Sequence, residues 1–454
     1  MRAAAWRAPA AGLALGAGLA LGALAAWSAL ASPAAAAPGP GALSTSEPWR
    51  PLLLAIVRHS RDTTAADSLE PGPFLPVPAE SLESAEEVPP ELRPFGARHP
   101  GFRLRHDRTL TLICDYNRVD QLRLGLRAAP PPPEPFYPRT AVGVSYSLGR
   151  SQWNYSASLE QPLYRQPYIA LGGRVYRQTD SPDWELLGRV ENTLSALLLR
   201  QDYLDYFGRR GAGAFARLEW PAAGRLELDY RADELTALQA RRETWSLMGG
   251  DPFRPNPAFS EGRLHQLSGV LNLSSRGGGQ APRPGADLEL ALEHGGGWLG
   301  GDLAFTRVHG ETRWTSKLAP GLWLNLRAAA GASLGDSLPS EFDFYVGGVG
   351  TLRGHEFKEQ TGDRFYLFNA EYAVNLGEHI AALDRDETLR GLELVLFSEV
   401  GRAWGGRGQP GSGPAWDAGV GLQTTGDGFH LYLAQNLNAS RGGPKVSFRL
   451  TRAF

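Results

Sequence analysis

Apolar and polar residues alternate along this chain from about residue 118 to the last residue. In residues 225–231, leucine and tyrosine alternate with charged residues, and residues 286–293 repeat the pattern with three leucines on one face. A period of two is typical of a β-strand with one apolar and one polar surface. A water-soluble sandwich closes after seven to nine strands, whereas this pattern continues far longer. The chain is therefore predicted to be all-β, with one very large sheet.

The number and length of the alternating segments favour strands that cross a membrane. Most segments have the nine to eleven residues that a tilted strand needs to span a bilayer. Fifteen lie near residues 119–128, 140–149, 152–161, 167–177, 211–220, 223–232, 263–274, 286–294, 300–316, 321–334, 364–376, 391–404, 414–424, 428–438 and 443–454. A barrel with both ends on one side needs an even number of strands. We therefore expect a transmembrane antiparallel β-barrel of about 16 strands, with 12 or 14 as alternatives.

The first 36 residues have the features of a secretory signal peptide. Arg2 and Arg7 precede an apolar stretch at 10–30, and small residues at 32–36 provide a cleavage site. The alternative is an N-terminal membrane anchor. No later run reaches 18 apolar residues, so we predict an exported protein that crosses the bacterial outer membrane by a closed sheet, which lipid accepts because its backbone groups are paired.

Residues 37–105 differ in composition from the rest of the chain. They contain 12 prolines, where average usage predicts roughly three. We interpret them as a poorly ordered periplasmic linker, with a small folded domain as the alternative. Residues 106–454 then form the barrel. Within it, residues 184–207 have leucines at helical spacing, which predicts a helical connection between two strands.

The overall composition excludes several other classes of protein. A net charge of −2 gives no field to attract nucleic acid, and the single cysteine, Cys114, excludes a disulfide framework. The nine histidines lack metal-ligand spacing, so no metal or other cofactor is expected. Aromatic residues near strand ends suit the girdles of a membrane barrel; they are Trp220, Trp298, Trp323, Trp404, Trp416 and Phe454.

One segment carries a family resemblance. Residues 347–357, Gly-Gly-Val-Gly-Thr-Leu-Arg-Gly-His-Glu-Phe, resemble the arginine-glycine-aromatic motif of the long sixth loop in the BamA/TamA outer-membrane superfamily. Residues 368–376 and 397–404 are similar to the two strands that follow this loop, and residues 117–125 resemble a first barrel strand. The resemblance covers roughly residues 110–454 and implies a loop that folds into the barrel lumen.

The resemblance also implies functional residues. The loop arginine of the family pairs with an acidic residue on each of the two following strands, and these positions fall on Arg353, Glu371 and Glu399. The alternation independently places both glutamates on the polar, lumen-facing side. Gly354 and Phe357 complete the loop motif, and the terminal aromatic Phe454 corresponds to the barrel-assembly signal.

The family acts in outer-membrane protein assembly or in translocation of protein or lipid, through a weak seam between the first and last strands. The implied partners are outer-membrane lipid and unfolded or exported clients; the sequence indicates no oligomeric state. Residues 37–105 are too short for more than one of the periplasmic POTRA domains of the family, so the chain resembles a member without them. This departure leaves a passive pore as an alternative function.

An enzymatic function is the least favoured alternative. Residues 331–335, Gly-Ala-Ser-Leu-Gly, match the G-x-S-x-G pattern of lipases, but a nucleophile elbow needs a strand, a sharp turn and then a helix. A loop is expected after Ser333, so we interpret the match as coincidental. The chain is not expected to be an enzyme.

Overall fold

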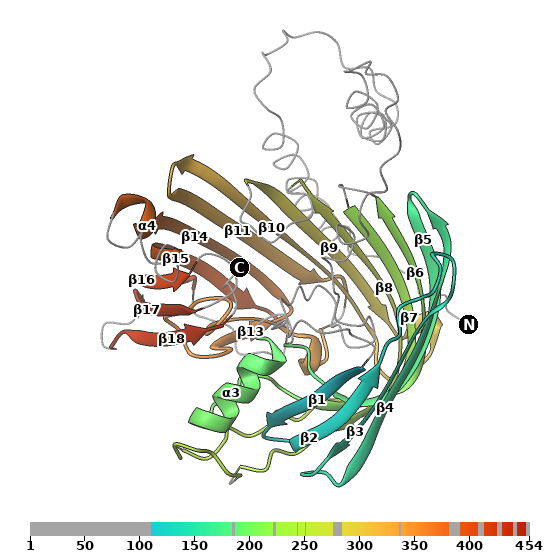
Figure 1. The fold of residues 1–454 in the computed structure, drawn as a ribbon. Helices are drawn as coiled ribbons and strands as arrows, with labels where there is room; N and C mark the ends of the chain where they lie inside the picture. Colours follow the sequence, from blue (N-terminus) through green and yellow to red (C-terminus); the bar gives the residue numbers. More distant parts are fainter. Residues whose placement is uncertain are drawn as a thin grey trace, which may run out of the picture. The chain divides into compact units, whose positions relative to one another are not determined.

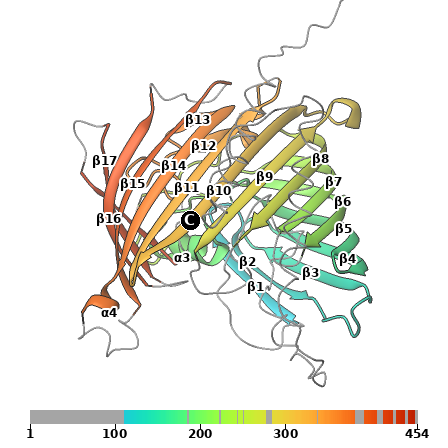
Figure 2. The same ribbon diagram turned by 90° about the horizontal axis from the view of Figure 1, so that it is seen from above.

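The computed structural model describes residues 110–183, 187–220, 224–242, 244–249, 251–275, 284–335, 337–380, 391–406, 413–424, 429–438 and 443–450. The expected signal peptide, the segment 37–105 and Phe454 lie outside these residues. Within them, sixteen strands form one antiparallel sheet in which each strand pairs with the next along the chain (Figures 1 and 2). The expected number of strands is confirmed, and the alternatives of 12 and 14 are wrong.

The strands of the large sheet are β1 (Leu110–Asn117), β2 (Gln121–Ala128), β3 (Arg139–Ser147), β4 (Gln152–Arg165), β5 (Tyr168–Asp180), β6 (Phe207–Trp220), β7 (Gly224–Ala237), β8 (Gly262–Ser274), β9 (Gly285–Gly295), β10 (Phe305–Ala319), β11 (Leu322–Ser333), β14 (Arg364–Asn375), β15 (Leu392–Trp404), β16 (Ala415–Thr424), β17 (His430–Asn436) and β18 (Lys445–Arg449). Two further strands, β12 (Phe344–Val346) and β13 (Gln360–Gly362), form a separate small sheet in the connection between β11 and β14. The short helices are α3 (Arg189–Leu199), α4 (Leu376–His379), and the 3-10 turns η3 (Gly297–Leu299) and η4 (Ser340–Phe342).

The position of the first strand corrects the sequence prediction. The side chain of Asn117 accepts hydrogen bonds from the backbone N–H groups of Val119 (2.9 Å) and Asp120 (2.7 Å), which makes a tight turn at this point. Residues 117–125 are therefore not one strand but the end of β1, this turn and the start of β2. β1 escaped detection because Leu112 and Ile113 are adjacent, which interrupts the alternation.

The faces of the sheet are inverted relative to those of a water-soluble protein. On β15, Glu393 and Glu399 are buried, whereas Leu396 between them is 47% exposed. Ion pairs join the inward-facing polar side chains of neighbouring strands, as between Arg327 and Glu311, 2.7 Å apart. A polar inner face and an apolar outer face are what a membrane-spanning sheet requires.

The connections alternate between the two ends of the sheet because the strands are antiparallel. We call the end that carries the β1–β2 turn, the β5–β6 connection and the β11–β14 connection the loop end. Trp404 and Trp416 lie at strand termini on the loop end, and Trp220 and Trp323 lie at strand termini on the opposite end. This distribution agrees with aromatic girdles at two membrane interfaces.

The predicted helical connection is confirmed, but it is shorter than expected. Within residues 187–207, only Arg189–Leu199 is helical, because residues 202–206 turn away to bond with other connections of the loop end. No helix of the described residues is long and apolar enough to cross a membrane.

The two edges of the sheet differ from the closed arrangement that the sequence predicts. Within the described residues, β1 pairs only with β2, and β18 pairs only with β17. The helix α3 packs against β1 and is hydrogen-bonded to β18 through Glu191 (Figure 1). The seam between first and last strands is therefore occupied by a helix in this structure.

Candidate functional site in the long loop

The β11–β14 connection, residues 334–363, forms a folded loop with secondary structure of its own. The turn η4 leads into β12, which pairs with β13 near the end of the loop. Between these strands, Gly347, Gly348 and Gly350 all have positive φ angles, a backbone conformation that side chains other than glycine rarely adopt. The chain can therefore reverse direction within a few residues and bring Arg353 back to the wall.

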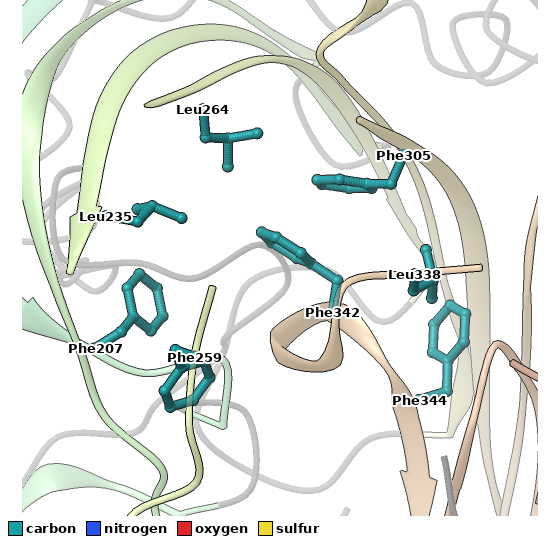
Figure 3. Packing of buried hydrophobic residues seen from close by; sticks show 8 residues of the cluster. All are labelled: Phe207, Leu235, Phe259, Leu264, Phe305, Leu338, Phe342 and Phe344. Carbon is teal, nitrogen blue, oxygen red and sulfur yellow. The ribbon is translucent and has the colours of Figure 1, made fainter. Parts of the chain in front are cut away.

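Aromatic packing anchors the first part of the loop (Figure 3). Phe342 stacks on Phe305 of β10 with ring centroids 4.2 Å apart, and Phe344 stacks on Phe365 at 4.8 Å. The full buried cluster consists of Phe207, Leu235, Phe259, Leu264, Phe305, Leu338, Phe342 and Phe344. Since burial of each large apolar side chain stabilises by about 1.5–3 kcal/mol, this cluster holds the loop against the inner face of β6–β10.

Arg353 binds the inner wall further along the loop. Its guanidinium Nη2 lies 2.5 Å from Glu371 on β14 and 3.1 Å from Glu399 on β15. Its backbone N–H also donates to Glu399 over 2.7 Å. Asn369, the cross-strand neighbour of Glu399, donates to the same carboxylate over 2.9 Å. The two glutamates therefore meet one arginine, as the family motif implies.

Two aromatic rings complete the environment of Arg353. The guanidinium carbon lies 4.1 Å from the ring centre of Phe397 and 4.2 Å from that of Tyr432. Such cation–π contacts are worth about 2 kcal/mol when they are desolvated. Burial by itself lowers the pKa of Arg353, but the carboxylates of Glu399 and Glu371 raise it above its ordinary value. Arg353 is thus a permanent cation held by charge and by stacking.

Gly354 extends the same contact to a third strand. Its backbone N–H donates to Asp417 on β16 over 2.7 Å. A Cβ atom at this position would lie 2.8 Å from the Cβ of Asp417 and 2.9 Å from the backbone nitrogen of Asn436, so only glycine fits without displacement of strands. We call the contacts of Arg353 and Gly354 with Glu371, Glu399 and Asp417 the Arg353 clasp.

Asp417 is a site residue that sequence reasoning missed. It lies opposite Glu399 in the β15–β16 register and is fully buried. The signal was present in the alternation, because Asp417 follows the outward-facing Trp416 and therefore points inward. The family resemblance implies only two acidic partners, Glu371 and Glu399.

Phe357 does not join the Arg353 clasp. Its ring packs edge-on against Tyr203 at 6.0 Å and lies near Tyr345 at 6.2 Å. The guanidinium of Arg254 lies 4.8 Å from its ring centre. The loop motif thus reaches two different places: the arginine meets the strands, and the aromatic residue meets the connections at the loop end.

Lys358 makes a second polar contact next to Phe357. Its Nζ atom lies 2.8 Å from Asp183 and 2.7 Å from Asp205, both in the β5–β6 connection. Asp205 also pairs with Arg118 at 2.9 Å and with Arg254 at 2.5 Å. Burial raises the pKa of Asp183, although Lys358 and the Asp205 backbone N–H act in the opposite direction. We call the ion pairs of Lys358 with Asp183 and Asp205 the Lys358 contact.

The loop and the inner wall enclose a cavity of about 490 Å³. Arginine and carboxylate side chains from both line it, among them Arg231, Glu293, Arg307 and Glu341. No group of three or more His, Cys, Asp or Glu side chains within the described residues is arranged to hold a metal ion. The cavity is therefore lined by charged side chains of both signs and by aromatic rings.

The remaining candidate positions lie elsewhere. Ser333 is the last residue of β11, and its hydroxyl donates to the backbone oxygen of Thr306 over 3.4 Å. The next helical element is the three-residue turn η4, so the strand–turn–helix geometry of a nucleophile elbow does not surround Ser333.

Comparison with known proteins identifies the fold. The Omp85 superfamily domain matches residues 140–426, which is more than half of the chain. BamA from Haemophilus ducreyi lacking POTRA domains 1–3 is similar in structure, with a TM-score of 0.50 and 13% identity over 76% of this chain and 70% of that chain. None of the curated protein sequences matches the chain significantly.

Two CdiB structures also match. CdiB from Escherichia coli has 14% identity and a TM-score of 0.41, over 76% of this chain and 63% of that chain. CdiB from Acinetobacter baumannii has 13% identity and a TM-score of 0.39, over 72% and 55%. The chain thus spans less than two thirds of the length of either CdiB structure. The family match confirms the resemblance carried by residues 347–357, and the chain belongs to the Omp85 superfamily.

Proposed function

We propose that this protein acts in the outer membrane, in the assembly of membrane proteins or in the translocation of protein or lipid. The Arg353 clasp is the observation that carries this proposal, because it holds the long loop against three consecutive strands of the inner wall. An ordinary surface loop has no need of a buried arginine with two carboxylates and two aromatic rings. In the same proposal, Phe454 provides the terminal barrel-assembly signal.

The strand edges support the same proposal. β1 and β18 each have one unpaired side within the described residues, and an unpaired strand edge can template an incoming strand. The family and the fold are those of outer-membrane proteins. Such a strand edge and an apolar outer face would bind proteins or lipids.

A passive pore fits the geometry less well. The loop packs against the wall by an apolar cluster and the Arg353 clasp, and the cavity of about 490 Å³ beside it is lined by side chains of both signs. A permanently open channel would instead leave a water-filled passage along the inner face.

Deletion of the gene, followed by profiling of outer-membrane proteins and lipids, tests the proposed function. We expect depletion of specific outer-membrane proteins or an altered lipid distribution, restored by the wild-type gene and by an Arg364→Ala variant. The Arg353→Ala gene is expected to restore the protein and lipid profiles poorly, although its product still inserts into the membrane.

Conductance measurements in planar bilayers test the passive-pore alternative. We expect small and intermittent currents from the purified protein. A large, steady conductance together with unchanged protein and lipid profiles after deletion would replace the proposed function with that of a pore.

A further inference from the structure

The helix α3 lies between the two edges of the sheet. On one side, the backbone N–H of Tyr116 in β1 donates to the hydroxyl of Thr193 over 3.1 Å. On the other side, Glu191 accepts hydrogen bonds from the Nε of Arg449 (2.8 Å) and from the backbone N–H of Leu450 (3.1 Å). The helix therefore binds one backbone N–H group of β1 and one that directly follows β18.

The geometry of a helix explains how one element can bind both edges. Successive residues are rotated by about 100°, so Glu191 and Thr193 point in nearly opposite directions. Asn192, between them in the sequence, points to a third side, where Ala196 follows one turn later. Asn192 and Ala196 are both buried. Three sides of the helix thus face β18, the interior and β1.

The fourth side of α3 is apolar and uncovered. Val190 is 53% exposed and Leu194 is 39% exposed, and both lie opposite Asn192 on the helix. A helix on the surface of a water-soluble protein buries its apolar side and exposes its polar side. In contrast, α3 exposes Val190 and Leu194 and buries Glu191 and Asn192 together with Ala196.

The neighbouring β7–β8 connection continues this apolar surface. The backbone N–H groups of Leu247 and Met248 donate to the carbonyl oxygens of Leu197 and Leu198 at the end of α3, over 2.8 and 3.1 Å. The hydroxyl of Tyr116 in β1 donates to the carbonyl oxygen of Trp245 over 2.6 Å. The side chains of Trp245, Leu247 and Met248 are all exposed. We call Val190, Leu194, Trp245, Leu247 and Met248 the seam patch.

We propose that α3 is part of the membrane wall and that lipid acyl chains cover the seam patch. The flanking strands follow the same rule, since Leu112 on β1 and Phe448 on β18 are exposed, whereas Asp115 on β1 and Arg449 on β18 are buried. A lipid environment accepts α3 because its backbone groups are paired within the helix. Its two lateral contacts satisfy strand-edge groups that would otherwise meet hydrocarbon, where each unpaired group costs several kcal/mol.

The placement of α3 in contact with lipid rests on the proposed location in the outer membrane, but it does not depend on the proposed role in assembly or translocation. It assigns a lipid-binding surface to a connection between β5 and β6, a part of the chain that is remote in sequence from both β1 and β18. It also means that a strand added to the edge of β1 at Tyr116 must displace Thr193, and that a strand added beside Arg449 and Leu450 must displace Glu191.

Fluorescence quenching in lipid vesicles tests this inference directly. A single bimane label is attached at Leu194→Cys in the full-length protein, with Cys114→Ser to remove the natural thiol. The protein is placed in phosphatidylcholine vesicles with or without brominated acyl chains, and iodide is the water-soluble quencher. We expect strong quenching by brominated lipid and weak quenching by iodide.

Two labelled positions calibrate the result. Leu171→Cys on the outer face of β5 marks a lipid-facing site, and Glu356→Cys, with an 80% exposed side chain, marks a water-facing site. We expect the ratio of lipid to iodide quenching at Leu194→Cys to match that at Leu171→Cys. A ratio that matches Glu356→Cys would overturn the inference. Val190→Cys, on the same side one turn earlier, gives the same comparison if the Leu194 variant does not fold.

Discussion

The Arg353 clasp and the Lys358 contact hold the same loop, only five residues apart, to two different kinds of structure. The partners of Arg353 and Gly354 lie on β14, β15 and β16, which are hydrogen-bonded to neighbours on both sides. The partners of Lys358 lie in the irregular β5–β6 connection. One contact joins the loop to strands of the sheet, and the other joins it to a connection outside the sheet.

This difference predicts different energetic roles. A strand cannot move to relieve an unpaired charge, whereas a connecting segment can rearrange and admit water. The Arg353 clasp should therefore fix the position of the loop in the barrel. The Lys358 contact should couple the loop to the β5–β6 connection, which also carries α3.

Replacement of Arg353 by alanine should have the largest effect. Glu371 and Glu399 would remain buried without their cation, which costs about 3–5 kcal/mol when one partner of a buried ion pair is removed. We expect insertion to be retained, but the free energy of loop release should fall by this order. Hydrogen exchange of the amides in residues 344–362 measures the change, and limited proteolysis of the loop provides a second readout.

Arg364→Ala is the matched control for the loss of positive charge. Arg364 starts β14, next to the loop, but its side chain is 55% exposed and its distance to Asp363 is 4.0 Å. Exposed pairs of this kind contribute about 1 kcal/mol or less. Equal exchange rates in the Arg353 and Arg364 variants would show that the clasp does not hold the loop.

Gly354→Ala probes the rigidity of the strands in the clasp. The added methyl group would meet the Asp417 side chain and the Asn436 backbone nitrogen at less than 3 Å, and overpacking of this kind costs up to about 3 kcal/mol. Gly413→Ala is the control, because a Cβ there has no atom within 4 Å. Thermal unfolding followed by gel mobility should show a lower transition for Gly354→Ala alone. If the two variants unfold at the same temperature, the strands next to Gly354 move to accommodate the added methyl group.

The same difference explains what could be predicted from the sequence. Alternation fixed the inner faces of the strands, so Glu371 and Glu399 could be assigned once the loop motif was found, and Asp417 was accessible to the same argument. The partners of Lys358 could not be predicted in this way, because Asp183 is 175 residues away and lies in a connection without periodicity. The helix α3 was predicted from its leucine spacing, but its place between β1 and β18 depends on three-dimensional closure that no local pattern encodes.

Lys358→Met should have a smaller effect that depends on pH. Asp205 keeps its ion pairs with Arg118 and Arg254, so the main loss falls on Asp183, at about 1.5–3 kcal/mol for a hydrogen bond to a charged group. Burial already raises the pKa of Asp183, and removal of Lys358 should raise it further. Protonation then relieves the cost at low pH, so the destabilisation should be larger at pH 8 than at pH 5.

Lys445→Met serves as the control for Lys358→Met. Lys445 forms an ion pair with Glu356 of the same loop at 2.6 Å, but the Glu356 side chain is 80% exposed, and such a pair is worth little. Hydrogen exchange of the amides in residues 357–361 and 202–206 should increase together in Lys358→Met and in neither segment of Lys445→Met. Increased exchange in the loop alone would break the proposed coupling to the β5–β6 connection.

The smallest expected effect concerns Asp343, which lies in the loop between the aromatic anchors Phe342 and Phe344. Burial, with the nearby charges of Asp363 and Glu341, raises the pKa of Asp343 to about 6 from an ordinary value of 3.8. The docked loop therefore binds a proton more tightly than the released loop does, and docking weakens as pH rises from about 4 to 6 and then stays constant.

Asp343→Asn removes this dependence. Because Asp343 is only half-buried, we expect the substitution to stabilise the docked loop by less than about 1 kcal/mol at pH 7.5 and not at all at pH 4. Exchange rates of residues 340–346 at the two pH values, corrected for intrinsic exchange, measure it. If loop docking in Asp343→Asn keeps the pH dependence of the wild type, another group causes that dependence. The charge of Asp343 would then have no effect on the packing of Phe342 and Phe344.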